Sequence, residues 1–172
     1  MNAKLTRLFL GIAAVGAVAA CTVNLSFTYP KGGVVVAITD ATTVNQAIPL
    51  DFSTQAEVKA HKANVKDLTL EYLDATVVSV TSGSGVTITG QMKLRPDGVT
   101  DASKDVTVGT LTAVPVTVGT KVHLVGSPAL DALVLSTIKG SGKATAYIVG
   151  SATGTANFTL DLALHLSMAY EP

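Results

Sequence analysis

The C-terminal segment 158–170 most strongly limits the folds open to this chain. Every even-numbered position in it holds a large apolar residue, and the odd-numbered positions hold Thr159, Asp161, Ala163, His165, Ser167 and Ala169. A period of two puts these sets on opposite faces of a β-strand. At about 3.4 Å per residue the strand would exceed about 40 Å, which is long for a globular domain.

Shorter patterns of the same kind occur along the rest of the chain. Segment 22–29 also alternates, and the residues Pro30 to Gly33 predict a turn before a second strand at 34–38. Further strands are predicted near 48–52, 68–80, 86–94 and 144–149, with two or three more between 105 and 125.

Two segments carry helix signals instead. Thr54 and Glu57 have the spacing of a capping box, which predicts a helix from Thr54 to about residue 66. Ser127 and Pro128 suit the cap and first position of a second helix, and Gly140 suits its end.

These elements together define the predicted fold class. Eight or nine strands separated by turn residues, with two short α-helices, favour a mainly β protein: an antiparallel β-sandwich. Charged residues make up 14% of the chain, well below the average of about 25%, while Thr, Val, Ala, Ser and Gly are abundant. Because we find no internal repeat and no linker, we expect residues 21–172 to form a single domain.

The first twenty residues have a different character. Lys4 and Arg7 form a basic start, and the segment from Leu8 to Ala20 has no charge. That segment is too short for a membrane-spanning helix, which needs about 20 residues. The basic start, the short apolar run and the small residues at its end are typical of a secretory signal peptide.

The chain's single cysteine follows this segment directly. Val18, Ala19, Ala20 and Cys21 resemble the lipobox of bacterial lipoproteins. The resemblance covers only residues 1–22. It implies cleavage between Ala20 and Cys21, a diacylglycerol on the Cys21 sulfur and acylation of the new amino group. Thr22 is not the aspartate that signals inner-membrane retention in such proteins, which implies export to the outer membrane.

Charge and cysteine content exclude several classes of function. Without Lys4 and Arg7, ten basic residues face twelve acidic ones, a net charge of −2. Nucleic acid is therefore not an expected partner, because phosphate binding needs a basic field. With Cys21 acylated, neither a disulfide nor a cysteine-ligated metal can form, and we predict no metal site and no cofactor.

Few residues suggest chemistry. His61, His123 and His165 fall on a predicted helix and two different strands, so their positions do not indicate a catalytic or metal site. Asp101, Ser103 and Asp105 have the alternating spacing of a calcium loop, but Val106 stands where such a loop needs glycine. We interpret this segment as a solvated loop and the chain as not an enzyme.

One basic stripe suggests a contact surface. Lys59, Lys62 and Lys66 lie beside the apolar face of the first predicted helix. The plainer interpretation of such a stripe is a solvated edge of the helix. Near a membrane each such charge gains about 1 kcal/mol from anionic lipid, so the alternative is that these three residues contact anionic headgroups or a partner. The whole sequence predicts a membrane-anchored envelope lipoprotein, serving as a non-catalytic structural or interaction module with a protein partner of unknown identity. The alternative is a carrier of lipid or another apolar ligand.

Overall fold

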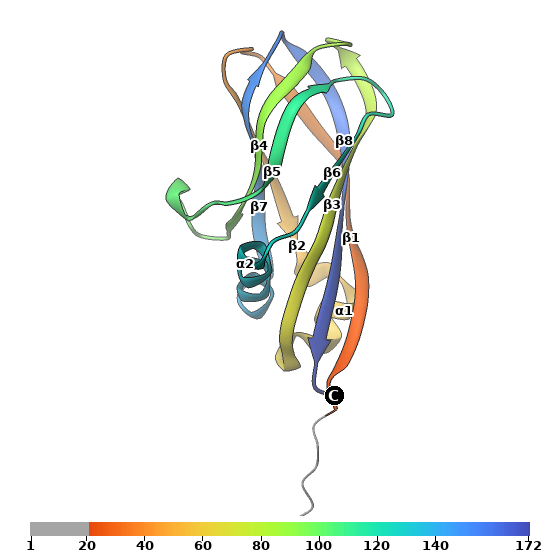
Figure 1. The fold of residues 1–172 in the computed structure, drawn as a ribbon, viewed down its shortest axis with the longest axis vertical. Helices are drawn as coiled ribbons and strands as arrows, with labels where there is room; N and C mark the ends of the chain where they lie inside the picture. The colour runs from red at the N-terminus through yellow and green to blue at the C-terminus, as the bar shows by residue number, and fades with distance from the viewer. Residues whose placement is uncertain (1–20) are drawn as a thin grey trace, which may run out of the picture.

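The structure is a computed structural model that describes residues 21–172 as two packed β-sheets (Figure 1). The predicted signal peptide, residues 1–20, lies outside the described residues. The elements are β1 (Val23–Ile38), β2 (Val44–Asp51), η1 (Phe52–Thr54), α1 (Ala56–His61), η2 (Lys62–Asn64), β3 (Val65–Ser82), β4 (Thr87–Pro96), η3 (Ala102–Lys104), β5 (Val106–Pro115), β6 (Lys121–Val125), α2 (Pro128–Lys139), β7 (Lys143–Ala152) and β8 (Ala156–Tyr170).

The strand order identifies the architecture. One sheet has the order β1-β8-β3-β6 and the other the order β2-β7-β4-β5, and all paired strands are antiparallel. This is the order of an eight-stranded jelly roll, a double-sheet form of β-sandwich. The predicted fold class is confirmed over residues 21–172, with eight strands and two short α-helices.

Strand β8 occupies the middle of the first sheet and holds it together. It pairs with β1 from Val23 to Ile38 and with β3 from Val65 to Ser82. The even-numbered residues of β8 from 156 to 168 are all buried in the core between the sheets. The alternation in 158–170 therefore predicted this strand and its buried face correctly.

The first predicted turn is wrong. Pro30 to Gly33 does not reverse the chain, because segments 22–29 and 34–38 belong to one continuous strand, β1. The register against β8 slips between Lys31 and Val34, and Gly33 adopts a φ of 69°. This is a glycine β-bulge, in which one extra residue is accommodated without leaving the sheet. The Gly33 amide donates to Asp161 Oδ1 on β8 at 2.8 Å, so the neighbouring strand supplies the partner that the bulge needs.

The first predicted helix is also shorter than expected. Its α-helical part covers only Ala56–His61, and its cap residue, Gln55, makes no side-chain hydrogen bond. Thr54 Oγ1 does not cap the helix but donates to the Asp51 carbonyl at 2.8 Å. The capping box therefore does not form. The chain leaves the helix early because Val65 pairs with Tyr170 and begins β3.

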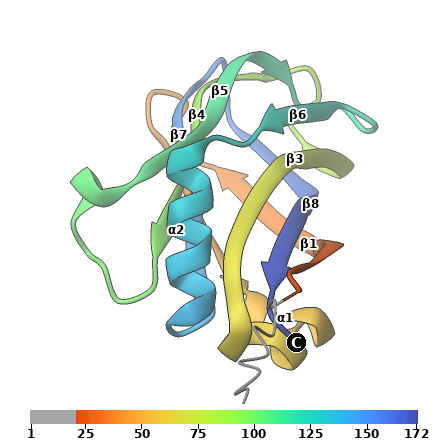
Figure 2. The same ribbon diagram turned by 60° about the horizontal axis from the view of Figure 1, so that its bottom comes forward.

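Helix α2 confirms the second helix prediction, with Ser127 accepting from the Leu130 amide and Gly140 at the C-cap. It lies along β3 below the short strand β6, as the view in Figure 2 shows. Asp131 Oδ1 accepts the Leu70 amide of β3 at 2.8 Å, and the Gly126 amide donates to the Glu71 carbonyl at 3.0 Å. The helix thus covers the part of the β3 edge that β6 leaves unpaired.

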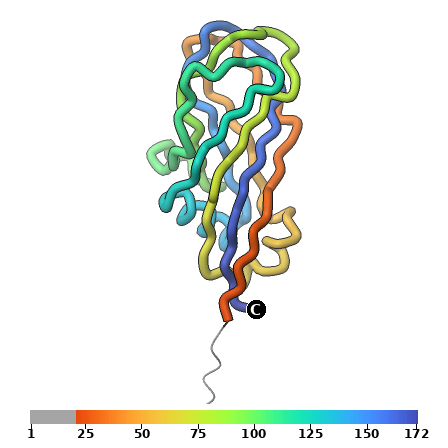
Figure 3. Tube along the Cα trace, turned by 45° about the vertical axis from the view of Figure 1, so that its right-hand side comes forward, coloured from red at the N-terminus to blue at the C-terminus, as the bar shows by residue number. Residues whose placement is uncertain are grey.

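The sandwich has two distinct ends. The turns β1–β2, β3–β4, β5–β6 and β7–β8 gather at the upper end in Figure 1, while α1, the start of β1 and the end of β8 lie at the lower end. Figure 3 shows β1 and β8 side by side down to this lower end, where the C-terminus lies. No helix within residues 21–172 is both long enough and apolar enough to cross a membrane.

Candidate functional site

The predicted lipidation residue lies at the lower end of the sandwich. Cys21 is exposed. Two residues later Val23 is already paired with Tyr170 of β8, and Tyr170 is also paired with Val65 of β3. The start of the described chain is therefore built directly into the sheet, with one residue, Thr22, between Cys21 and β1.

The three predicted headgroup lysines come from adjacent elements at this same end. Lys59 belongs to α1, Lys62 begins η2, and Lys66 is the second residue of β3. Lys62 Nζ donates to the carbonyl of Gly140, at the end of α2, at 2.6 Å. Lys66 Nζ lies 2.9 Å from Glu171 Oε2.

A groove open to solvent unites these side chains. Its volume is ≈ 760 Å³, and its lining includes Lys59, Lys62, Lys66, Lys139 and Glu171. We call this feature the basic groove. The sequence pattern pointed to the first three lysines, but Lys139 was recognised only as the basic end of a helix. Its place here depends on how α2 packs along β3, which no local signal encodes.

The histidines pair with tyrosines. His165 stacks on Tyr72 with ring centroids 4.1 Å apart, and the His123 ring lies 4.8 Å from the same tyrosine ring. The spacing of the histidines in the sequence did not predict that these two would lie on either side of one tyrosine. His61 stacks on Tyr170 at 3.7 Å. Within residues 21–172 no cluster of three His, Cys, Asp or Glu side chains is arranged to hold a metal ion.

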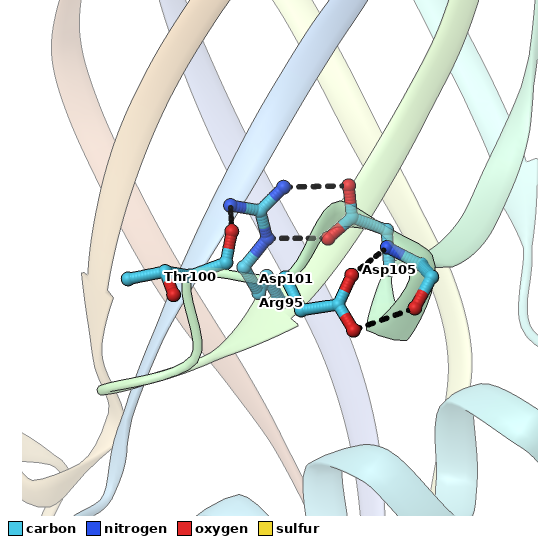
Figure 4. Close-up of polar contacts among 5 residues, drawn as sticks. Arg95, Thr100, Asp101 and Asp105 are labelled. Atoms are coloured by element: carbon cyan, nitrogen blue, oxygen red, sulfur yellow. Dashed lines mark hydrogen bonds and ion pairs between the residues drawn. The ribbon is translucent and has the colours of Figure 1, made fainter.

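The loop with calcium-like spacing is organised by an arginine (Figure 4). Arg95 donates through Nε and Nη2 to the two carboxylate oxygens of Asp105, at 2.5 and 3.0 Å, and through Nη1 to the Thr100 carbonyl at 3.3 Å. The hydrogen bond that the Arg95 guanidinium donates to Asp105 raises the pKa of Arg95. Both carboxylate oxygens of Asp105 are therefore bonded to Arg95. Arg95 also lies over the Tyr147 ring, 4.5 Å from its centroid.

The neighbouring carboxylate in this loop is also engaged. Asp101 accepts hydrogen bonds from the backbone amide and the hydroxyl of Ser103, at 2.9 and 2.8 Å. These bonds, the backbone one first, lower the pKa of the Asp101 carboxyl. The alternating oxygens therefore stabilise a short 3-10 turn and an ion pair, so the segment interpreted from the sequence as a solvated loop is held by its own hydrogen bonds.

The space between the sheets bears on the carrier alternative. An apolar cavity of ≈ 40 Å³ lies near the upper end, bordered by side chains such as Met92, Leu111, Val116 and Phe158. Pockets that hold small molecules usually measure about 300–1,000 Å³. The buried apolar residues of the two sheets form one continuous core, whose members run from Phe27 to Met168.

Comparison with known proteins gives little. No protein-family model and no curated protein matches the chain. Among solved structures, one of turnip yellow mosaic virus shares 12% identity over 99% of this chain and 92% of that one, with a TM-score of 0.38. A decameric BFDV capsid protein shares 14% identity over 86% of this chain and 99% of that one, with a TM-score of 0.44. At these TM-scores the jelly-roll assignment rests on this chain's own strand order.

Proposed function

We propose that this protein is a lipid-anchored protein of the bacterial cell envelope, held at the outer membrane through Cys21, and that its β-sandwich is a non-catalytic structural or interaction module. The observation that carries the proposal is the position of Cys21. It follows a signal-like segment in the sequence, and it lies exposed at one end of the sandwich.

The geometry at this end suits attachment close to a membrane. Only Thr22 separates Cys21 from the first residue of β1, so an acyl chain on the Cys21 sulfur would bring the lower end of the sandwich to the bilayer surface. Each methylene that enters the bilayer contributes about 0.8 kcal/mol, and two or three chains hold a protein far more firmly than one. The opposite end, with its four strand-connecting turns, would then face away from the membrane toward partners.

The packing of the interior favours a module over a carrier. A filled core that leaves a cavity of ≈ 40 Å³ has no room for an acyl chain in this conformation. The exposed outer face of the β1-β8-β3-β6 sheet supplies a surface for contacts instead, with Thr28 bonded to His165 at 3.1 Å and His123 to Asp74 at 2.6 Å.

Membrane fractionation of cells expressing the full chain tests the anchor. Replacing Cys21 with alanine, or treating the cells with globomycin, should release or mislocalise the protein. The conservative variant Thr22→Ser is the matched control and should leave fractionation unchanged. A Cys21 sulfur that carries no lipid in mass analysis, or a mature N-terminus elsewhere than residue 21, would refute the proposal.

A second variant tests the destination. Thr22→Asp should redirect the protein to the inner membrane in a diderm host, which density-gradient separation of the two membranes would show. Recovery of the unaltered protein in the inner-membrane fraction would contradict the outer-membrane assignment while leaving the anchor itself intact.

A further inference from the structure

We propose that the basic groove binds the phosphate group of anionic phospholipid headgroups and so fixes the orientation of the sandwich on the membrane. The inference rests on the proposed function in one respect, because it takes the membrane as the surface that Cys21 approaches. It adds a binding site with a defined ligand class to what would otherwise be only a tether.

Charge is distributed very unevenly between the groove and the rest of the molecule. The groove is lined by four of the ten basic residues after position 20 and by one of the twelve acidic ones. Its local charge is therefore +3, whereas the remaining six basic and eleven acidic residues give −5. An anionic surface attracts the first region and repels the second, so this asymmetry favours a single orientation.

The groove is assembled from separate elements, which limits its freedom to collapse. Lys59 comes from α1, Lys66 from the start of β3 and Lys139 from the last turn of α2. Lys62 ties two of these parts together through its 2.6 Å hydrogen bond to Gly140. A lysine ammonium has three donors, so Lys62 can keep this bond and still donate to a phosphate oxygen.

The single acidic residue of the groove does not block an anion. Glu171 pairs with Lys66 at 2.9 Å, and the two side chains are 40% and 54% exposed. Exposed pairs of this kind contribute only about 0–1 kcal/mol, so a phosphate can replace the carboxylate at small cost. Asp67, the neighbour of Lys66, lies in a different depression with Asn24 and Ser167.

The location of the groove favours a lipid over a soluble anion. The Glu171 amide donates to the Asn64 carbonyl at 3.2 Å, which joins the C-terminal end of the chain to the groove wall. Val23, two residues after Cys21, is paired with Tyr170, the residue before Glu171. The groove and the predicted anchor therefore share the same end of the molecule, where headgroup phosphates are the nearest anions.

A vesicle-binding assay tests the inference without the lipid anchor. The core residues lie between Phe27 and Met168, so the chain 21–172 carrying Cys21→Ser keeps the whole core. This protein should co-sediment with vesicles of phosphatidylcholine and phosphatidylglycerol at low salt, and not with phosphatidylcholine alone. Lys59 and Lys139 are the residues to change, because within residues 21–172 their ammonium groups make no hydrogen bond or ion pair.

The double variant Lys59→Gln and Lys139→Gln should weaken binding roughly 30-fold, at about 1 kcal/mol for each lysine. The matched control, Lys93→Gln with Lys121→Gln, removes the same charge outside the groove and should change binding less than about 3-fold. An equal loss in both double variants would overturn the inference, since only overall charge would then matter. So would binding of inorganic phosphate to the protein without binding to the vesicles.

The two proposals fail in distinguishable ways. If mass analysis finds lipid on Cys21 but the soluble chain does not bind anionic vesicles, only the groove inference is wrong. If the soluble chain binds anionic vesicles through Lys59 and Lys139 but mass analysis finds no lipid on Cys21, the anchor is wrong and the groove stands.

Discussion

Replacing Thr137 with valine should make the protein more stable. Thr137 lies on α2 with its side chain 4% exposed, and its hydroxyl has no hydrogen-bond partner within residues 21–172. The Leu133 carbonyl, one turn earlier, accepts from Ser136 Oγ at 2.8 Å instead. A buried hydroxyl without a partner costs about 1–3 kcal/mol, and valine has nearly the same shape without that cost.

The expected gain in the free energy of unfolding is large compared with the whole free energy of unfolding of a typical domain. It is about 1–3 kcal/mol against a free energy of unfolding of about 5–15 kcal/mol for a domain, and it corresponds to a rise in Tm of about 2–12 °C at this size. Urea unfolding of the chain 21–172, followed by circular dichroism, measures the change. Helix propensity does not decide the outcome, because threonine and valine are nearly equal in that respect.

A second variant separates the hydroxyl from the methyl group of Thr137. Thr137→Ser keeps the hydroxyl and deletes one buried methyl, so it should lose about 1 kcal/mol. The expected order of stability is therefore valine, threonine, serine. A valine variant less stable than the parent would refute the reasoning, because it would mean that the hydroxyl is hydrogen bonded in solution.

Three further predictions concern the elements around the site. Gly126→Ala should destabilise the protein by about 2–5 kcal/mol in urea unfolding, because the new Cβ would lie 1.5 Å from the Leu70 carbonyl oxygen and must displace backbone; an unchanged midpoint would contradict this. Asp105→Asn should lower the midpoint more than Asp97→Asn does, since only Asp105 pairs with Arg95. Hydrogen bonds lower the pKa of Asp101 in the folded state, so its stabilisation is present at neutral pH, begins to fall near about pH 4 and is lost as pH falls through the lowered folded-state pKa. The deficit of Asp101→Asn should therefore shrink below about pH 4; a deficit independent of pH would contradict the assignment.

Local patterns predicted those elements whose signals lie within a few neighbouring residues. The alternation in 158–170 predicted β8 because successive residues of a strand point to opposite faces, whatever the strand packs against. The cap and end signals of α2 worked for the same reason, since Ser127 and Gly140 satisfy orphan groups of their own helix. Lys59, Lys62 and Lys66 do line one groove, but they lie on α1, η2 and β3, so the helical spacing that grouped them is not what brings them together.

Other features depended on partners distant in sequence. The residues Pro30 to Gly33 suit either a turn or a bulge, and the choice was made by Asp161, on a strand 128 residues away, which accepts the Gly33 amide. The first helix ended where Val65 pairs with Tyr170, a residue more than a hundred positions later in the chain, and β3 begins.

The sequence by itself determined that this chain is a two-faced β protein with a signal-like start, a single cysteine at its junction and a basic stripe. Each of these properties depends on the residues' order and chemistry alone. Only the tertiary structure decided that the stripe, Lys139 and Cys21 share one end of the sandwich. That arrangement follows from α2 packing along the open edge of β3 and from β1 and β8 running side by side to the same end, and such long-range contacts leave no periodic signal in the sequence.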